Sequence, residues 1–308
     1  MRIIFAGSPA AAVPSLRAVA ASGHELVAVL TREDSPFGRK RILTPTPVAT
    51  VAAELGIPVI KADRLSLVAG EIAALDAALG VIVAYGGLVR EPLLSAPQRG
   101  WINLHFSLLP RWRGAAPVQR AIMAGDDVTG ASVFQLVEEL DAGPVYGRLT
   151  QAIGRSETAG HLLDSLAEAG AGLLAGVIDA IADGSARAEE QVGDITLAPK
   201  LGIEDGRLDW SASADTIDRR IRGVTPEPGA FTTIDGIRVK VLDAAPARDR
   251  PSLPPGLVSA DGGILVGTAT APIELVTVQP SGRTPMPAAA WWRGRTGRGP
   301  DAAEVRAE

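Results

Sequence analysis

The sequence predicts an α/β fold in which a doubly wound, mostly parallel sheet is followed by a small all-β domain. Apolar, strand-like runs alternate with segments of helical spacing between residues 3 and 136, which is typical of a parallel sheet covered by helices on both faces. Beyond residue 208 this alternation gives way to short apolar runs separated by Gly, Pro and Asp. A length of 308 residues accommodates two domains.

The predicted elements of the first domain alternate along the chain. The strands are apolar runs at residues 3–7, 25–30, 58–60, 81–85, 101–105 and 132–136. The helices have the apolar spacing of one helix face, at residues 11–21, 47–55, 71–79, 115–124 and 158–181. Because ligands of doubly wound sheets bind beyond the carboxyl ends of the strands, we expect a site among the loops that follow these strands.

The second domain is predicted to be a small β-barrel. It has a helix at 213–223 and short strands at 230–234, 238–242, 256–259, 264–267 and 273–278. Residues 185–206 are polar and irregular, which is typical of a linker. We therefore predict a first domain at 1–184, this linker, and a second domain at 207–308. We expect its tail to be disordered from about residue 297.

Composition excludes several kinds of site. The chain has no cysteine, which excludes a disulfide, a thiolate nucleophile and a zinc site built on cysteine. Its three histidines are scattered, so we expect no metal. The sequence has no unbroken apolar run of about 18 residues, and it begins with a strand in place of a leader peptide. We therefore expect a cytoplasmic protein without membrane contact. We also expect it to be a monomer.

The run WINLHFSLLPRWRG, residues 101–114, carries the strongest chemical signal in the chain. Side chains at positions i and i+2 of a strand point to the same face, so the amide of Asn103 and the imidazole of His105 converge. The amide can donate to an oxyanion and the imidazole can exchange a proton near neutral pH, as acyl transfer requires. On its own, an Asn-x-His pair more often satisfies backbone groups at a strand end.

A third group is needed to set the charge of the imidazole, and Asp141 is the best candidate. It lies in EELDAGP, residues 138–144, where Gly143 and Pro144 end the regular structure. An amide, an imidazole and a carboxylate then form a plausible acyl-transfer set.

The residues around this set carry a resemblance to a known family. The string Asn103-Leu104-His105-x-Ser107-Leu108-Leu109-Pro110-x-x-x-Gly114, with Leu140-Asp141-x-Gly143 downstream, resembles the signature of the folate-dependent formyltransferases. The stretch RWRGAAPVQR, residues 111–120, resembles in particular the members that act on initiator tRNA. The resemblance covers nearly the whole chain. It implies a Rossmann-like formyltransferase domain followed by a barrel of oligonucleotide-binding (OB) type.

The resemblance also implies the chemistry. Asn103, His105 and Asp141 would be catalytic, and 10-formyltetrahydrofolate would donate the formyl group. Asn103 would hold the developing oxyanion, His105 would help to stabilise it and relay a proton, and Asp141 would orient or charge the ring and manage the proton that leaves the attacking amine. We expect the Leu109-Pro110 bond to be cis. The predicted folate contacts are Tyr85, Gly86, Gly87, Leu88, Ser107, Leu108, Leu109, Pro110, Glu138 and Leu140.

The implied acceptor is the α-amine of methionine esterified to initiator tRNA. A formal net charge of −5 argues neither for nor against RNA, so contacts with tRNA would come from local basic clusters. The loop at 34–45 is long for a βα connection, and the resemblance implies that its basic residues inspect the acceptor end. The predicted tRNA contacts are Arg39, Lys40 and Arg41 in this loop, and Arg293 and Arg295 in the second domain.

Three other functions could use the same residues. A formyltransferase acting on a small amine would share Asn103, His105 and Asp141 but has less use for a basic loop together with a β domain. A formyltetrahydrofolate hydrolase would direct water at the formyl group, and the 111–120 stretch and the second domain argue against it. A non-enzymatic RNA- or folate-binding protein is the third, and the intact catalytic set argues against it. Formyl transfer to initiator tRNA is the favoured function.

Overall fold

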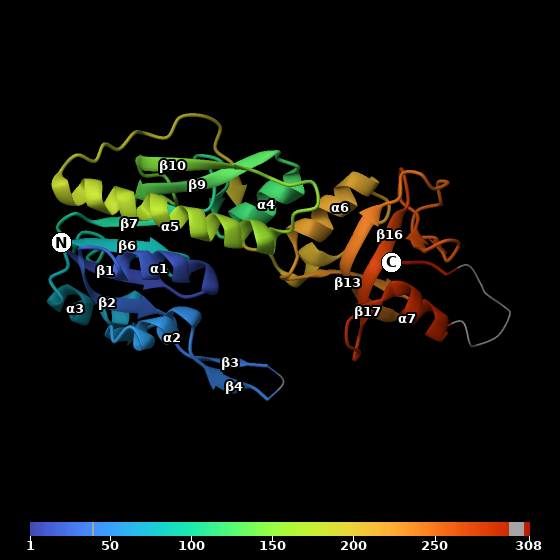
Figure 1. Ribbon diagram of the computed structural model, residues 1–308, viewed down its shortest axis with the longest axis horizontal. Coiled ribbons are helices and arrows are strands. Elements are labelled where there is room, and N and C mark those ends of the chain that lie inside the picture. The colour runs from blue at the N-terminus through green and yellow to red at the C-terminus, as the bar shows by residue number, and fades with distance from the viewer. Residues whose placement is uncertain (39, 296–304) are drawn as a thin grey trace. The chain divides into compact units, whose positions relative to one another are not determined.

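The structure, a computed structural model, describes residues 1–38, 40–295 and 305–308 (Figure 1). Its contacts divide the chain into two compact units. The first comprises Met1–Pro117, Val128–Ala152 and Leu163–Pro199, and the second comprises Val118–Asp127, Ile153–Leu162 and Lys200–Glu308. The domain and linker bounds given above stay a prediction.

The first unit is built on a seven-stranded sheet with the order β10-β9-β7-β6-β1-β2-β5. Strands β5, β2, β1, β6 and β7 run parallel, whereas β9 and β10 are antiparallel to their neighbours. The predicted fold class is confirmed. The strands are β1 (Arg2–Gly7), β2 (Glu25–Thr31), β5 (Val59–Lys61), β6 (Leu79–Val83), β7 (Trp101–His105), β9 (Val128–Gln135) and β10 (Val145–Ala152).

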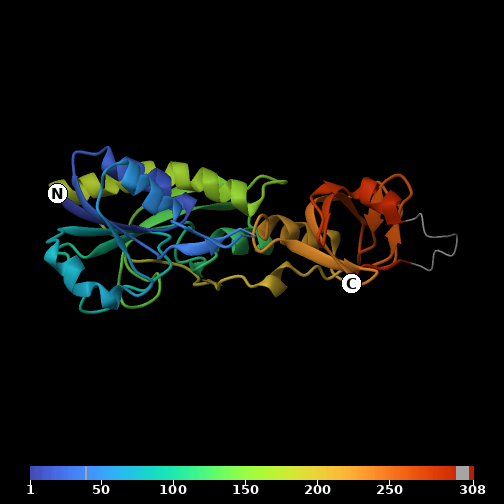
Figure 2. The same ribbon diagram turned by 90° about the horizontal axis from the view of Figure 1, so that it is seen from below.

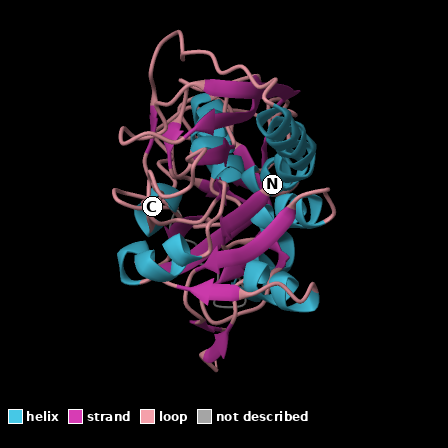
Figure 3. Ribbon diagram, turned by 90° about the vertical axis from the view of Figure 1, so that its left-hand side faces the viewer, coloured by secondary structure: helices cyan, strands magenta, loops and turns pink. Residues whose placement is uncertain are grey.

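Helices cover both faces of this sheet (Figures 2 and 3). Helices α1, α2 and α5 lie over one face and α3 lies over the other (Figures 1 and 2). The core beneath α3 contains Ile4, Leu30, Ile82 and Trp101. The helical segments of the first unit are η1 (Ala10–Ala12), α1 (Val13–Ala20), α2 (Pro47–Glu54), η2 (Leu65–Leu67), α3 (Ala69–Ala74) and most of α5 (Ala159–Asp183). Helix α4 (Pro117–Ala124) belongs, apart from its first residue, to the second unit.

Among the described residues, α5 is the one helix long and apolar enough, by length and composition, to cross a membrane. From residue 163 on it lies along the sheet (Figure 1), and 44% of its most apolar window is buried. The Cβ that an alanine would place at Gly170 lies 3.0 Å from Leu104 of β7. This close approach is what a core helix makes with the sheet that it covers.

The strand order reverses at β1, from which the chain passes first to β2 and β5 and then to β6 and β7. Loops leaving the carboxyl ends of β1 and β6 meet there, and the Ser8 hydroxyl donates to the Tyr85 carbonyl oxygen at 3.2 Å. Such a reversal is where doubly wound sheets bind their ligands. The site was predicted among the loops beyond the carboxyl ends of the strands, and the topology favours the same edge of the sheet.

The structure differs from the prediction in a few elements. The helix expected at 71–79 ends at Ala74, because Asp76 adopts a positive φ of 48° and β6 begins at Leu79. Strand β10 was not predicted, since an edge strand buries only part of its side chains and its apolar alternation is weak. The long loop also forms an unpredicted hairpin of β3 (Ser35–Phe37) and β4 (Ile42–Thr44).

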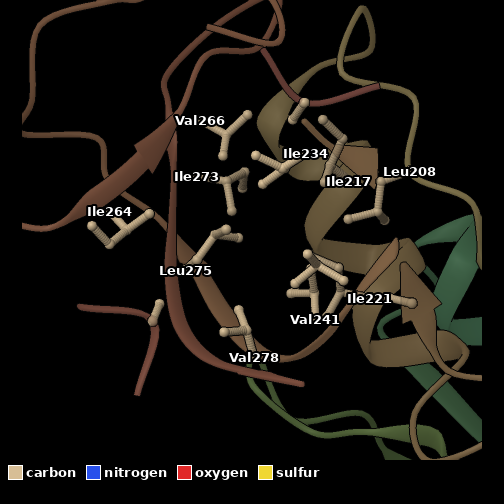
Figure 4. Close-up of a cluster of buried hydrophobic side chains, with 14 of the residues drawn as sticks. Leu208, Ile217, Ile221, Ile234, Val241, Ile264, Val266, Ile273, Leu275 and Val278 are labelled. Carbon is tan, nitrogen blue, oxygen red and sulfur yellow. The ribbon is translucent and has the colours of Figure 1, made fainter. Parts of the chain in front are cut away.

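The second unit contains an antiparallel sheet with the order β12-β13-β16-β15-β14, to which β17 adds beside β16. Helix α6 contributes Ile217 and Ile221 to its core, where they join Val241, Val266 and Val278 of the sheet (Figure 4). The predicted helix and strands are present, and β17 and α7 were not predicted. The elements are η3 (Ile203–Gly206), α6 (Ala214–Gly223), β12 (Ala230–Ile234), β13 (Ile237–Pro246), β14 (Val258–Ser259), β15 (Ile264–Val266), β16 (Ile273–Pro280), β17 (Met286–Pro287) and α7 (Ala288–Arg295).

Residues 305–308 link the two edges of this sheet. On one side the Val258 amide donates to the Val305 carbonyl at 2.9 Å and the Ala307 amide to the Gly256 carbonyl at 2.8 Å. On the other side Thr233 and Glu308 exchange two backbone hydrogen bonds, of 2.9 and 2.8 Å. The prediction of a disordered tail is therefore wrong for residues 305–308, whose backbone groups are paired. Its part at 297–304 lies outside the described residues.

Candidate active site

His105 is the last residue of β7, and the residue is 6% exposed. Its Nε2 lies 2.9 Å from the backbone carbonyl oxygen of Trp112. A carbonyl oxygen can only accept, so Nε2 carries a hydrogen. The other nitrogen, Nδ1, lies 3.8 Å from Oδ2 of Asp141. Nδ1 is therefore the ring atom available for proton exchange, and it faces the carboxylate.

Asp141 lies in the loop between β9 and β10, where it adopts a positive φ of 48° and is 8% exposed. Its Oδ2 accepts a hydrogen bond of 2.7 Å from the Gly114 amide. Gly114 has a φ of 125°, and a Cβ added there would lie 2.7 Å from the Ala198 carbonyl oxygen. Only glycine fits this position, so the close approach of residues 113–114 to residues 197–198 requires it.

Asn103 is half-buried in the middle of β7, two residues before His105 and on the same face of the strand. In the described part of the chain its carboxamide has no hydrogen-bond partner. A buried or half-buried amide normally has one. The Asn103 amide is therefore free to bind a ligand atom beside the His105–Asp141 pair.

The turn that follows His105 is held by hydrogen bonds within the protein. The Ser107 hydroxyl donates to the Arg111 carbonyl at 2.6 Å, and the Ser132 hydroxyl donates to the Ser107 carbonyl at 2.7 Å. The Leu109-Pro110 bond is cis, as predicted. Leu109 is buried with Phe134 and Val145. Of the predicted folate contacts in this turn, Ser107 and Leu109 point into the protein, and Leu108 is the most accessible side chain.

The loop after β6 presents mainly backbone. Tyr85 is 2% exposed and its hydroxyl donates to the Ala62 carbonyl, so its ring belongs to the core. Burial raises the pKa of Tyr85 above its usual value, while Arg32 lowers it and Asp63 raises it further. Gly86 is exposed with a φ of 80°, and Leu88 is 66% exposed.

The predicted folate contacts on the Asp141 loop lie on the surface. Glu138 is exposed and Leu140 is 52% exposed. An apolar side chain that exposed is suited to cover a flat ring, as Leu88 is on the other loop.

The predicted tRNA contacts fall into two groups. Lys40 and Arg41 are exposed at the turn between β3 and β4, and Arg39 lies outside the described residues. In helix α7, Arg293 is exposed. Arg295 is paired with Asp235 and stacks on Trp291 and Trp292 at 5.0 and 4.9 Å. Burial lowers the pKa of Arg295. Its Nη2 pairs with Asp235, while its Nη1 is buried without a hydrogen-bond partner among the described residues.

Two contributors to this site were not predicted. The Trp112 carbonyl orients His105, and a backbone carbonyl has no residue-type signal in a sequence. Gln191 donates to the Asp141 carbonyl at 2.7 Å, although it lies in the predicted linker. The described residues contain no group of three or more His, Asp or Glu that could hold a metal ion.

Family models and curated relatives both match nearly the whole chain, and both match it to formyl transferases. Residues 1–178 match the formyl transferase family, and residues 200–296 match the formyl transferase C-terminal domain. The chain is 62% identical over 298 residues to the methionyl-tRNA formyltransferase of Clavibacter sepedonicus, covering 96% of this chain and 98% of that one. It is 60% identical over 299 residues to the methionyl-tRNA formyltransferase of Leifsonia xyli subsp. xyli, covering 96% and 98%.

Solved structures share the fold at low identity. WlaRD, a sugar 3N-formyl transferase solved with dTDP and 5-N-formyl-THF, has a TM-score of 0.69 at 15% identity and covers 92% of this chain and 99% of its own. HypX from Aquifex aeolicus in complex with tetrahydrofolic acid has a TM-score of 0.62 at 17% identity, covering 97% of this chain and 48% of its own. The matched families and the relatives of high identity lead to one conclusion: this chain belongs to the formyl transferase family.

Proposed function

We propose that this protein transfers the formyl group of 10-formyltetrahydrofolate to the α-amino group of methionyl initiator tRNA, giving N-formylmethionyl-tRNA. The name shared by its relatives, at 51 to 62% identity over nearly the whole chain, supports the acceptor. The observation that carries the chemistry is the unpaired Asn103 amide beside the His105–Asp141 pair.

The donor set fits a formyl group. A formyl carbonyl has one oxygen that becomes negative when an amine adds to its carbon, and Asn103 offers amide hydrogens that no protein group of the described chain uses. We infer that the folate ring lies between the loops of Tyr85-Gly86-Gly87-Leu88 and Glu138 to Asp141. The exposed side chains of Leu88 and Leu140 support this placement.

The steps follow from the atoms available. The neutral α-amine attacks the formyl carbon, a C–N bond forms, and the carbonyl electrons move onto oxygen. The Asn103 amide and a protonated His105 Nδ1 stabilise this oxyanion. Asp141 balances the charge of the ring and accepts the proton that the amine loses. When the intermediate collapses, the bond from carbon to N10 of the folate breaks. N10 takes up the proton that Asp141 accepted from the amine, which gives tetrahydrofolate and restores the carboxylate.

We propose that the chemistry lies in the domain at 1–184 and that the domain at 207–308 binds tRNA. Lys40 and Arg41 on the exposed β3–β4 hairpin are the proposed contacts with the acceptor end, together with Arg39. Arg293 and Arg295 are proposed contacts in the second domain. We further propose a cytoplasmic monomer without membrane contact, to be tested by light scattering and by cell fractionation.

The test is transfer of labelled formyl from 10-formyltetrahydrofolate to methionyl initiator tRNA. Methionyl elongator tRNA and free small amines are the control acceptors, and His105→Ala is the control enzyme. Initiator-selective transfer that is lost in His105→Ala is the expected result. Folate turnover without formylated tRNA would point to a hydrolase or a small-amine enzyme, and tRNA binding without turnover would leave only a binding protein.

A further inference from the structure

The chain between the two matched regions contacts the candidate active site. The family matches cover 1–178 and 200–296, and residues 185–206 were predicted to be a linker. In the structure, β11 (Leu197–Ala198) pairs in parallel with β8 (Arg113–Gly114). The Trp112 amide also donates to the Thr196 hydroxyl at 2.8 Å. Residues 189–198 therefore run alongside the turn that orients His105.

Gln191 is the residue of this segment that reaches both catalytic loops. Its Nε2 donates to the Asp141 carbonyl at 2.7 Å and to the Gly143 carbonyl at 2.9 Å. Its Oε1 accepts two hydrogen bonds from Arg113, from Nε at 3.2 Å and from Nη2 at 2.8 Å. Every hydrogen of the amide nitrogen is thus used, and none of these four bonds leads to solvent.

Arg113 extends the network from the turn after His105. The residue is 7% exposed, and its Nη1 pairs with Glu139 at 3.0 Å. A buried guanidinium needs such fixed acceptors, because an unpaired buried charge lowers the stability of the fold. Arg113 is also bonded through the backbone to Gly114, whose amide donates to the Asp141 carboxylate.

These contacts form a closed ring. It runs from the Asp141 carbonyl through Gln191 and Arg113 to the Gly114 amide, and back to the Asp141 carboxylate. Both ends of Asp141, its main chain and its side chain, are held by one set of partners. A residue with a positive φ keeps that conformation only where its surroundings impose it. Any displacement of Gln191 therefore moves the carboxylate relative to Nδ1 of His105.

We propose that Gln191, together with Arg113, is a positioning residue that sets the distance and direction of Asp141 toward His105. The predicted linker is then part of the catalytic apparatus. Gln191 contacts neither the Asp141 carboxylate nor Nδ1 of His105, so it acts through the main chain of Asp141. The kinetic part of this proposal rests on the proposed function, whereas the structural part does not.

The sharpest variant is Gln191→Glu, which keeps the shape and the acceptor for Arg113 but removes the donor to the two carbonyl oxygens. The matched control is Gln151→Glu on β10, where the same change breaks one amide hydrogen bond to Ser165, of 3.0 Å, away from the site. We expect Gln191→Glu to lower kcat by about 10- to 100-fold, as loss of an orienting partner does at metal sites. KM for folate and tRNA should change by less than about threefold, since all hydrogen-bonding groups of the Gln191 amide are already used by Asp141, Gly143 and Arg113. Gln151→Glu should keep the kcat of the parent enzyme.

A double-variant cycle with Asp141→Asn, in which kcat is measured, separates positioning of Asp141 from a general disturbance of the fold. If Gln191 acts through Asp141, adding Gln191→Glu to Asp141→Asn costs nothing further. Multiplied losses would overturn the proposal, and so would equal kcat values for Gln191→Glu and Gln151→Glu. Should Gln191→Glu fail to fold, Arg113→Lys replaces it in the same cycle, because lysine keeps the charge but cannot make the two-pronged bond to Oε1.

An NMR measurement keeps this test independent of the reaction. The chain has three histidines, so the ring signals can be assigned with His105→Ala. Gln191→Glu should shift the ring signals of His105 and leave those of His24 and His161 in place. Unmoved His105 signals would overturn the proposal even in a protein that formylates tRNA. Shifted signals would support it even if the acceptor proved to be another amine.

Discussion

The ring Nε2 of His105 donates to the carbonyl oxygen of Trp112 across 2.9 Å. This bond leaves Nδ1 as the nitrogen of His105 that is available for proton exchange. Trp112 has a φ of 62°, a conformation that few non-glycine residues adopt. The turn that presents its carbonyl is held by the Thr196 hydroxyl. With Nε2 occupied, Nδ1 is the remaining ring nitrogen, and it lies 3.8 Å from Oδ2 of Asp141.

Asn103→Asp tests the oxyanion contact. The variant keeps the shape but replaces the amide donor with a negative charge where negative charge develops. We expect kcat to fall by about 10²- to 10³-fold. The melting temperature of Asn103→Ala, which adds no charge, should change little, because the Asn103 amide makes no hydrogen bond within the described chain. Single-turnover formyl transfer and thermal unfolding measure the two effects. A kcat within threefold of the parent would remove Asn103 from the mechanism.

Gly114→Ala tests the close approach of Gly114 to the backbone of Ala198. A Cβ at this φ of 125° meets the Ala198 carbonyl oxygen at 2.7 Å, so we expect a loss of about 1 to 3 kcal/mol in the free energy of unfolding. Activity should fall as well, since the Gly114 amide holds Asp141. The control is Gly172→Ala in α5, where an added Cβ meets nothing within 4 Å. There we expect a gain of about 0.5 to 1 kcal/mol. Urea unfolding of both variants gives the comparison, and a neutral Gly114→Ala would contradict the steric argument.

Ending the chain after residue 304 tests the closure of the antiparallel sheet. The truncation removes the backbone bonds that join Val258 and Thr233 to the last residues, and it uncovers the core beside Ala307, which is 6% exposed. At about 1 kcal/mol for each of the four lost backbone hydrogen bonds, the free energy of unfolding should fall by roughly 4 kcal/mol. Glu308→Gln keeps every backbone bond and should change it by less than about 0.5 kcal/mol. Equal stability of the truncated and full chains would mean that the edges do not need this link.

Tyr85→Phe tests the buried hydroxyl that donates to the Ala62 carbonyl. Near pH 7 the variant should lose about 1 to 3 kcal/mol, because a buried carbonyl is left without its partner. Burial raises the pKa of Tyr85 in the folded protein, so its hydroxyl stabilises the fold fully below the unfolded pKa of about 10. That contribution is lost as the pH rises through the higher folded pKa. The difference between the two proteins should therefore shrink above about pH 10.

Denaturant unfolding at neutral and alkaline pH checks this dependence. The raised pKa of Tyr146 affects the parent and Tyr85→Phe alike and cancels in their difference. A difference that widens with pH would show that the sign is wrong.

The double variant Lys40→Ala/Arg41→Ala tests the hairpin. Both side chains are exposed at its turn, so removing them should raise KM for tRNA and reduce its dependence on salt without lowering the stability of the fold. Folate affinity should stay within twofold. Arg155→Ala, another exposed arginine, should leave KM for tRNA unchanged. Equal behaviour of the hairpin variant and this control would place the tRNA contacts elsewhere.

The sequence by itself determined the fold class, and it predicted Asn103, His105 and Asp141 as the catalytic set. Apolar runs for the parallel strands are nearly continuous because those strands are buried on both faces, so β1, β2, β6 and β7 were predicted close to their observed bounds. The i, i+2 relation of Asn103 and His105 is a local property of a strand, and it can be predicted without knowing which strands lie beside it. Turn residues after Asp141 likewise marked the end of a strand.

Only the tertiary structure decided what holds these residues. Asp141 meets His105 because β9 returns antiparallel beside β7, and Gln191 reaches Asp141 because the 189–198 segment folds back along β8. An irregular, polar segment has no periodic apolar pattern that could indicate its long-range contacts. In the sequence, a segment that binds the loops of His105 and Asp141 therefore cannot be distinguished from a linker. The link made by residues 305–308 was hidden for the same reason, since it consists of backbone hydrogen bonds that any side chains allow.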